Sequence, residues 1–247
     1  MNKPTLSVII AAFNAEVYLR DSILSLLNEK LSGLEIIVVD DGSSDLTGEV
    51  VKGLPVKLIR LQKNIGQAAA QNRGVKEARG KYLCFFDSDD ILVKGGLWWR
   101  VKYLECHPKA NLVAGKIAGI IDSQGKLIGS YRKVLNPDYR LPPSRLTKKY
   151  LASGGEFPSQ SWLMLFRKEF LKKVGPMDET LRCAHDNDFF YRVLAHGPIP
   201  FENKSVAYYR LHETNLSGKW KSGKFQLYPR NQAENLWVHL ANGISPK

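Results

Sequence analysis

The chain has 247 residues, 44% of them hydrophobic, so it can bury a sizeable core in one large domain or two small ones. No run of about 18 apolar residues occurs, so the sequence predicts no membrane-spanning helix. The three cysteines are widely spaced and form no C-x-x-C pair. They imply neither a disulfide framework nor a zinc site, and a cytoplasmic location fits.

The charge is strongly basic and unevenly placed. Lys and Arg total 36 against 24 Asp and Glu, which gives a net charge of +12. Residues 1–100 hold 13 basic and 12 acidic residues, whereas the remaining 147 hold 23 and 12. This excess favours anionic partners such as nucleotide phosphates, nucleic acid or an acidic membrane surface.

Apolar runs alternate with helical patterns through the first hundred residues. The first run, near the N-terminus, is short and gives way to Asn14 and Glu16, so it predicts a strand and not a signal peptide. In chain order we expect a strand at 6–13, a helix at 16–31, a strand at 34–40, a short helix from 45, a strand at 56–61, a helix at 66–79, a strand at 81–86 and a helix at 91–104.

Beyond residue 100 the alternation loosens. We expect strands at 110–122, 161–167 and 205–212, and helices at 168–175 and 187–197. Strands that alternate with helices require right-handed crossovers, which predicts an α/β fold with a mostly parallel, doubly covered sheet.

The stretch "CFFDSDD" at 84–90 places three carboxylates directly behind a buried strand. If the extended geometry continues, Asp87 and Asp89 face one way and Asp90 the other. Two carboxylates on one side suit Mg²⁺ or Mn²⁺. The alternative is a turn with an Asp cap on the following helix.

Other polar residues also follow predicted strands. Asn14 follows the first strand, and Asp40 and Asp41 end the second. In open α/β sheets ligands bind beyond the carboxyl ends of the strands, so this coincidence favours a site there.

An ordered series of motifs resembles the family 2 glycosyltransferases with the GT-A fold. The resemblance spans roughly residues 4–217 and implies a metal-dependent, inverting transfer of a sugar from a nucleotide-sugar, with UDP-sugar favoured. The motifs are "SVIIAAFN" (7–14), "IIVVDDGSSD" (36–45), "NIGQAAAQNRGVKEARGKYLCFFDSDD" (64–90), "FRKEFLKKVGPMDETL" (166–181), "AHDNDFFYRVL" (184–194) and "YYRLHETNLS" (208–217).

The resemblance assigns the D-x-D element to Asp87, Ser88 and Asp89, which would hold the metal and diphosphate of the donor. Asp89 would be the direct ligand of Mn²⁺ or Mg²⁺, and Asp87 would act through the ribose or a metal-bound water. His212, in a Y-R-x-H pattern, would be a second metal or diphosphate contact. A lone His can equally be a surface or satisfied core residue.

The donor's base and ribose are assigned to the corner at Asp40 and Asp41, although a plain Asp-Gly turn also fits there. The remaining donor-binding candidates that the resemblance implies are Ala11 and Phe13 through their backbone, Asn14 and Asn72.

Asp186 is the candidate catalytic base, because a carboxylate in hydrogen-bond reach can take the proton of the attacking hydroxyl. The alternative is a helix cap, a role that Asp188 could fill instead. The family usually shows Glu before this Asp, but here the residue is His185.

Three other classes compete. A Rossmann dehydrogenase needs G-x-G-x-x-G, but residues 11–16 read "AAFNAE". A nucleotidyltransferase usually carries a Gly-rich, Lys-bearing loop near its N-terminus, and this sequence has no such loop there. A nucleic-acid-binding protein fits the charge, but the basic residues are dispersed and no nucleic-acid motif occurs, so we expect no nucleic-acid partner.

The resemblance implies one GT-A domain over 1–217, with a Rossmann-like, nucleotide-sugar-binding half (1–100) and an acceptor and catalytic-base half (101–217). A basic, aromatic C-terminal tail (218–247) follows. The acceptor would be a glycan, a lipid-linked oligosaccharide or a protein. The basic and aromatic composition of this tail predicts weak contact with the inner face of the membrane. The alternative is that its aromatic side chains pack back on the domain.

Overall fold

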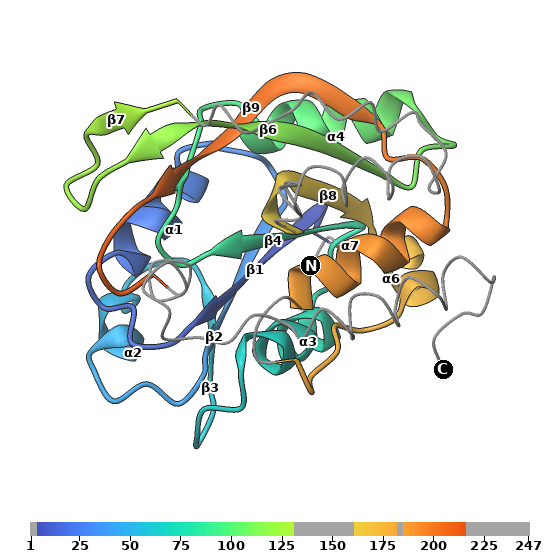
Figure 1. Cartoon of the computed structure of the whole chain (residues 1–247). Helices are drawn as coiled ribbons and strands as arrows, with labels where there is room; N and C mark the ends of the chain where they lie inside the picture. Colours follow the sequence, from blue (N-terminus) through green and yellow to red (C-terminus); the bar gives the residue numbers. More distant parts are fainter. Residues whose placement is uncertain (1–3, 131–160, 182–184, 216–247) are drawn as a thin grey trace, which may run out of the picture.

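The computed structural model describes residues 4–130, 161–181 and 185–215 (Figure 1). The tail at 218–247 lies outside the described residues, so its two interpretations stay predictions. Within the described ranges no helix is long and apolar enough to cross a membrane.

The first half of the chain builds the parallel part of one nine-stranded sheet. Strands β1, β2, β3 and β4 are parallel and lie in the order β3-β2-β1-β4. Their connections contain helices, as the alternating pattern predicts. The elements are β1 (Leu6–Ala12), α1 (Leu19–Leu27), β2 (Leu34–Asp40), α2 (Thr47–Val50), β3 (Lys57–Arg60), α3 (Gln67–Glu77) and β4 (Tyr82–Asp87).

The strand order reverses at β1. The chain moves from β1 outward to β2 and β3, then returns to place β4 on the other side of β1. Ala11 is therefore paired with Val39 on one side and with Asp87 on the other. Such a reversal opens a crevice at the carboxyl ends of the strands, where open α/β sheets bind ligands.

The second half extends the sheet with mixed pairing, in the order β4-β8-β6-β9-β5, with β7 paired to β6. Strand β8 is antiparallel to β4 and β6, whereas β9 is parallel to β6. The elements are β5 (Ile91–Leu92), α4 (Gly96–Cys106), β6 (Leu112–Ile121), β7 (Leu127–Gly129), η1 (Ser161–Leu163), β8 (Met164–Arg167), α6 (Lys168–Val174), α7 (His185–Ala195) and β9 (Phe201–Arg210).

Helices cover both faces of the sheet, as predicted. Val8 and Ile10 face a core cluster that α1 and α4 close, whereas Ile9 faces the cluster closed by α3, α6 and α7 (Figure 1). Helix α3 packs so closely that a Cβ on Gly74 would lie 2.4 Å from Ile9 Cγ2. Only glycine fits this helix against the sheet.

The predicted helix at 91–104 is wrong in its first turn. Residues Ile91–Leu92 form β5, which pairs with β9, and α4 begins only at Gly96. The side chain of Glu29 sets that start, because its carboxylate accepts the N–H groups of Gly95 at 2.5 Å, of Leu97 at 3.1 Å and of Trp98 at 3.2 Å. This cap comes from a distant segment, which local pattern does not reveal.

Candidate active site

Three carboxylates gather where β4 ends. The strand stops at Asp87, the chain bends through Ser88 and Asp89, and one oxygen from each of Asp87, Asp89 and Asp90 lies within 4.8 Å of the others. The expectation that Asp90 faces away is therefore wrong, because the extended geometry ends with the strand. Asp90 is fully buried and accepts the backbone N–H of Arg210 at 2.9 Å.

The end of β9 closes over this acidic cluster. Asp89 Oδ2 lies 2.9 Å from His212 Nε2 and 3.0 Å from Asn215 Nδ2. The Arg210 Nε–H donates to the backbone carbonyl of Asp89 at 2.8 Å. The structure thus brings together the two residues that the sequence assigned to the metal, Asp89 and His212.

Helix α1 supports this arrangement through Tyr18, which the sequence did not single out. The Tyr18 ring lies 4.5 Å from the His212 ring, between centroids, and the Arg210 guanidinium carbon lies 4.8 Å from the Tyr18 centroid. Stacking of a cation and an imidazole on one aromatic ring restricts both side chains. Tyr18 gave no motif signal, and Asn215, although it lies in the motif at 208–217, was not singled out, because its contact with Asp89 spans 126 positions.

Burial and neighbouring negative charges raise the pKa of two carboxyls in the acidic cluster. Burial, followed by the charges of Asp89 and Asp186, raises the pKa of Asp87 well above its usual range. Burial, followed by Asp89 and Asp87, does the same to the pKa of Asp90. Asp90 Oδ2 is also buried without a hydrogen-bond partner among the described residues. Clustered carboxylate oxygens with an unsatisfied acceptor fit a hard divalent cation.

Asp87 is itself held in place by neighbouring polar groups. Its backbone carbonyl accepts the Ser22 hydroxyl at 3.0 Å, and its Oδ1 lies 3.4 Å from Gln67 Nε2. Ser22 comes from α1 and Gln67 begins α3. Helices on both faces of the sheet therefore fix the position of this carboxylate.

The corner after β2 is tied to the end of β1. Asn14, at a positive φ of 48°, accepts the Ser44 N–H at 3.0 Å, and its own N–H donates to the Ser43 hydroxyl at 3.0 Å. Asp40 accepts the Ser43 N–H at 3.0 Å and lies 3.2 Å from Arg60 Nε. Phe13 is 48% exposed just beyond β1.

Asp41 is an anchor for the loop before α3. Its carboxylate accepts the N–H of Ile65 at 2.8 Å and of Gly66 at 2.9 Å, and the residue is 2% exposed. Both carboxylate oxygens of Asp41, the residue that the resemblance favours for the donor's base, therefore already accept backbone N–H groups. A role of Asp41 toward the donor's base therefore stays a hypothesis.

Asn72 is hydrogen-bonded to the segment after α6, and its predicted role in donor binding stays a prediction. Its Oδ1 accepts the Met177 N–H at 2.8 Å, and its Nδ2 donates to the Met177 carbonyl at 2.9 Å and to Glu179 Oε1 at 2.9 Å. The structure therefore gives Asn72 a structural role, because both ends of its amide hold α3 to the segment after α6.

Asp186 lies in the first turn of α7, near the acidic cluster. Its Oδ1 accepts the Ser161 hydroxyl at 3.2 Å and lies 3.4 Å from His185 Nε2. Burial raises the pKa of Asp186, while His185 and Ser161 lower it. The charge of Asp186 acts on the pKa of Asp87, so the candidate base and the D-x-D element share one site.

The capping alternative for these acids is wrong. Helix α7 begins at His185, so both Asp186 and Asp188 lie inside its first turn and neither precedes it. Asp188 Oδ2 instead pairs with Arg192 one turn later, at 2.7 Å from Nη2.

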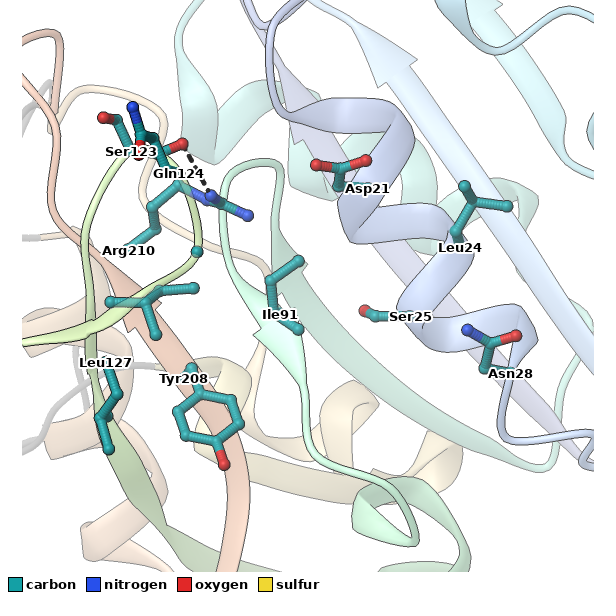
Figure 2. Close-up of a pocket in the computed structure, with 12 residues that line it drawn as sticks. Asp21, Leu24, Ser25, Asn28, Ile91, Ser123, Gln124, Leu127, Tyr208 and Arg210 are labelled. Atoms are coloured by element: carbon teal, nitrogen blue, oxygen red, sulfur yellow. Dashed lines mark hydrogen bonds between the residues drawn. The ribbon is translucent and has the colours of Figure 1, made fainter.

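A groove of about 680 Å³ lies beside the acidic cluster, between α1 and the hairpin of β6 and β7 (Figure 2). Arg210 reaches it from the cluster and donates to the Ser123 carbonyl at 3.1 Å. Its lining also includes Asp21, Leu24, Asn28, Ile91, Leu127 and Tyr208. Apart from Arg210, none of these lining residues was predicted to belong to the site or contacts the acidic cluster in the contacts described above.

Comparisons with known proteins agree with this architecture. A family model described as "Glycosyl transferase family 2" matches residues 7–175. An uncharacterised glycosyltransferase of Haemophilus influenzae is 38% identical over 109 residues, covering 42% of this chain and 44% of that protein. A second one from the same organism is 34% identical over 249 residues, covering 97% of this chain and 75% of that protein.

A solved structure shares the fold. The crystal structure of S. aureus TarS 1-349 in complex with UDP-GlcNAc superposes with a TM-score of 0.70 at 21% identity, covering 96% of this chain and 65% of that one. The chain thus spans less than half of the first relative and about two thirds of TarS 1-349. The predicted GT-A fold is confirmed, and the chain belongs to glycosyl transferase family 2.

Proposed function

We propose that this protein transfers a sugar from a nucleotide-sugar, with UDP-sugar as the favoured donor, to a hydroxyl of a glycan, lipid-linked or protein acceptor. The transfer inverts the anomeric carbon and depends on Mn²⁺ or Mg²⁺. The observation that carries this proposal is the placement of Asp87, Asp89 and Asp90 beside Asp186, where the strand order reverses.

The donor side of the proposal rests on the strand ends. Asn14, Asp40 and Asp87 follow or end β1, β2 and β4, which are neighbours in the sheet. In this fold class a nucleotide lies across such a row of strand ends. The TarS structure with UDP-GlcNAc supports a UDP-sugar as the donor, because it is a complex of the same fold.

A divalent cation fits the acidic cluster. Asp87, Asp89 and Asp90 supply clustered oxygen ligands, and the oxygen of Asp90 without a partner among the described residues would gain one. When bound, such a cation offsets the negative charge that grows on a departing diphosphate. Asp89 is the proposed direct ligand, since 25% of its side chain is exposed while Asp90 is fully buried.

The chemistry on the acceptor side belongs to Asp186. Its carboxylate accepts the proton of the acceptor hydroxyl while that oxygen bonds to the anomeric carbon. The bond from the anomeric carbon to the donor phosphate breaks, and its electron pair leaves with the nucleoside diphosphate. Attack from the face opposite the leaving group inverts the configuration. Ser161 holds the carboxylate in place.

The test is a panel of nucleotide-sugars and nucleoside diphosphates, screened for thermal stabilisation with and without Mn²⁺. We expect UDP and at least one UDP-sugar to raise the melting temperature only when the metal is present, because a ligand that binds the native state stabilises it. Nucleoside diphosphate release with a matching acceptor would follow. Release of pyrophosphate from a nucleoside triphosphate would instead identify a nucleotidyltransferase and contradict the proposal.

A further inference from the structure

His185 is a buried imidazole whose polar atoms are not satisfied. It is the first residue of α7 and only 6% exposed. Neither Nδ1 nor Nε2 has a hydrogen-bond partner among the described residues. A buried polar group without a partner costs about 1–3 kcal/mol, so a native structure that keeps one requires an explanation.

Among the described residues, this ring lies within ion-pair distance of the candidate base. His185 Nε2 lies 3.4 Å from Asp186 Oδ1, which is ion-pair distance but longer than a good hydrogen bond. Catalytic hydrogen bonds are often long in a protein without its substrate and shorten when the substrate binds. The distance therefore fits an imidazole–carboxylate pair that shortens to a hydrogen bond when the substrate binds.

The other described groups around Asp186 do not offer it a positive charge. Ser161 of η1 donates a neutral hydroxyl to the same Oδ1, and Asp87 of β4 acts on the site with like charge. On α7 itself, Arg192 is paired with Asp188, and it also donates to the Val174 carbonyl at the end of α6.

The charged groups that α6 contributes lie at its surface, where Glu169 pairs with Lys172 at 3.0 Å and both side chains are largely exposed. In the part of the chain that the structure describes, His185 is thus the group able to carry positive charge within ion-pair distance of Asp186.

We propose that His185 is a positioning residue for Asp186: its imidazole, through Nε2, keeps the Asp186 carboxylate ionised and aimed at the attacking hydroxyl. This inference rests on the proposed function, since it concerns the base of that transfer. His185 makes and breaks no bond to the sugar. The proton passes from the acceptor oxygen to Asp186, as the oxygen–carbon bond forms and the carbon–phosphate-oxygen bond breaks.

The physical need for such a residue follows from the burial of Asp186. Burial favours the protonated acid, and a protonated acid cannot accept the hydroxyl proton. His185 and the Ser161 hydroxyl oppose that effect and lower the pKa of Asp186. Without His185, the Ser161 hydroxyl is the remaining described group that lowers the pKa of Asp186. Asp186 then becomes protonated, and stops acting as a base, at a higher pH.

The direct test needs no substrate. In the full chain with ¹³C-labelled aspartate, the Asp186 carboxyl signal is identified by its absence from Asp186→Asn and followed with pH. We expect His185→Gln to raise the titration midpoint of Asp186 by about one unit, because it removes the imidazole that lowers the pKa of this carboxyl. His185→Glu, which places a like charge there, raises it further. An unchanged midpoint in His185→Gln overturns the proposal.

The matched control is His196→Gln, the same substitution at the end of the same helix, where the ring stacks edge-on against Phe170. It leaves the Asp186 midpoint unchanged. If His185→Gln does not fold, His185→Asn provides the same comparison with a shorter neutral amide. The same outcomes support or overturn the proposal in either variant.

Kinetics then separate this inference from the proposed function. With a working donor and acceptor, the acid limb of the pH–rate profile of His185→Gln moves up by the same unit, a tenfold loss of rate on that limb, while UDP affinity is unchanged. If the midpoint shifts but the wild type transfers no sugar from any donor, the proposed function fails and the pairing of His185 with Asp186 stands. If transfer is normal and the limb does not move, the positioning role fails alone.

Discussion

His212 and Asp89 are 123 positions apart in sequence, and their side chains meet at 2.9 Å between Nε2 and Oδ2. Because an ionised carboxylate only accepts hydrogen bonds, Nε2 carries the proton in this contact. A nitrogen that holds a proton is not a metal ligand. In the proposed function Asp89 is therefore the direct metal ligand, and His212 orients its carboxylate instead of binding the metal itself.

Replacing the candidate base separates binding from chemistry. Asp186→Asn is nearly isosteric and can keep the Ser161 contact, so UDP affinity with Mn²⁺ stays at the wild-type level. Turnover falls by on the order of 10²-fold or more, since general-base catalysis contributes that much. Single-turnover transfer measures it, and a wild-type rate in this variant would move the base elsewhere.

The structural role of Asn72 predicts a stability effect without a binding effect. Asn72→Ala leaves the Met177 N–H and carbonyl without their partner, so the free energy of unfolding falls by about 2–4 kcal/mol. Urea unfolding measures the loss. Calorimetry at a temperature where the variant is folded should give wild-type UDP affinity. A selective loss of affinity with normal stability would restore the donor-binding role.

Glu35 makes stability depend on pH in the acid range. Burial raises the pKa of its carboxyl, but the Arg79 backbone N–H, the Ser7 hydroxyl and the Arg79 guanidinium outweigh burial and lower the pKa below the usual value of a glutamate. A carboxyl whose folded pKa is lowered stabilises the fold above its unfolded pKa and loses that contribution as pH falls through the folded value.

Glu35→Gln should therefore cost about 1–2 kcal/mol at pH 7, and the difference from wild type should shrink as pH falls below about 4.5. Urea unfolding at a series of pH values gives this difference directly. Glu49→Gln is the control, because its exposed pair with Lys52 contributes little. A gap between wild type and Glu35→Gln that is as large at pH 3 as at pH 7 would refute the assignment.

The basic and aromatic composition of the C-terminal segment 218–247 predicts that it attaches weakly to anionic membranes. Its basic residues would contribute roughly 1 kcal/mol each near such a surface, and salt screens them within a Debye length. These residues alternate with aromatic ones: Lys219, Trp220, Lys221, Lys224, Phe225, Tyr228, Arg230 and Trp237. Liposomes should sediment the full chain at low salt, but not at high salt, and not a chain ended at Ser217. Equal sedimentation of both chains contradicts a role for the tail.

The sequence predicts the parallel half of the fold well because its signals are local. The run at 34–40 matches β2 residue for residue, and the acidic stretch marks the end of β4. The strand-end candidates Asn14, Asp40 and Asp87 do lie at the carboxyl ends of neighbouring strands. Hydrophobic periodicity and strand ends are sufficient to place these three residues at one edge of the sheet.

What the sequence missed depends on distant partners. Strand β5 forms because Ile91 pairs with Tyr208, against the helical pattern of its segment. The role of Asn72 depends on Met177, 105 positions away. The direction of Asp90 depends on the N–H of Arg210 at the end of β9. Local propensity contains no information about such pairings, so tertiary contacts override it.

The metal-dependent binding of UDP by Asp89 is the central claim, and calorimetry of UDP with and without Mn²⁺ tests it most directly. Wild type should bind UDP more tightly with Mn²⁺, and Asp178→Asn, which removes an exposed carboxylate far from the acidic cluster in sequence, should behave like wild type. Asp89→Asn should fold normally and lose the Mn²⁺-dependent part of the affinity, because it deletes the charged ligand. Unchanged, still metal-dependent affinity in Asp89→Asn would contradict the account.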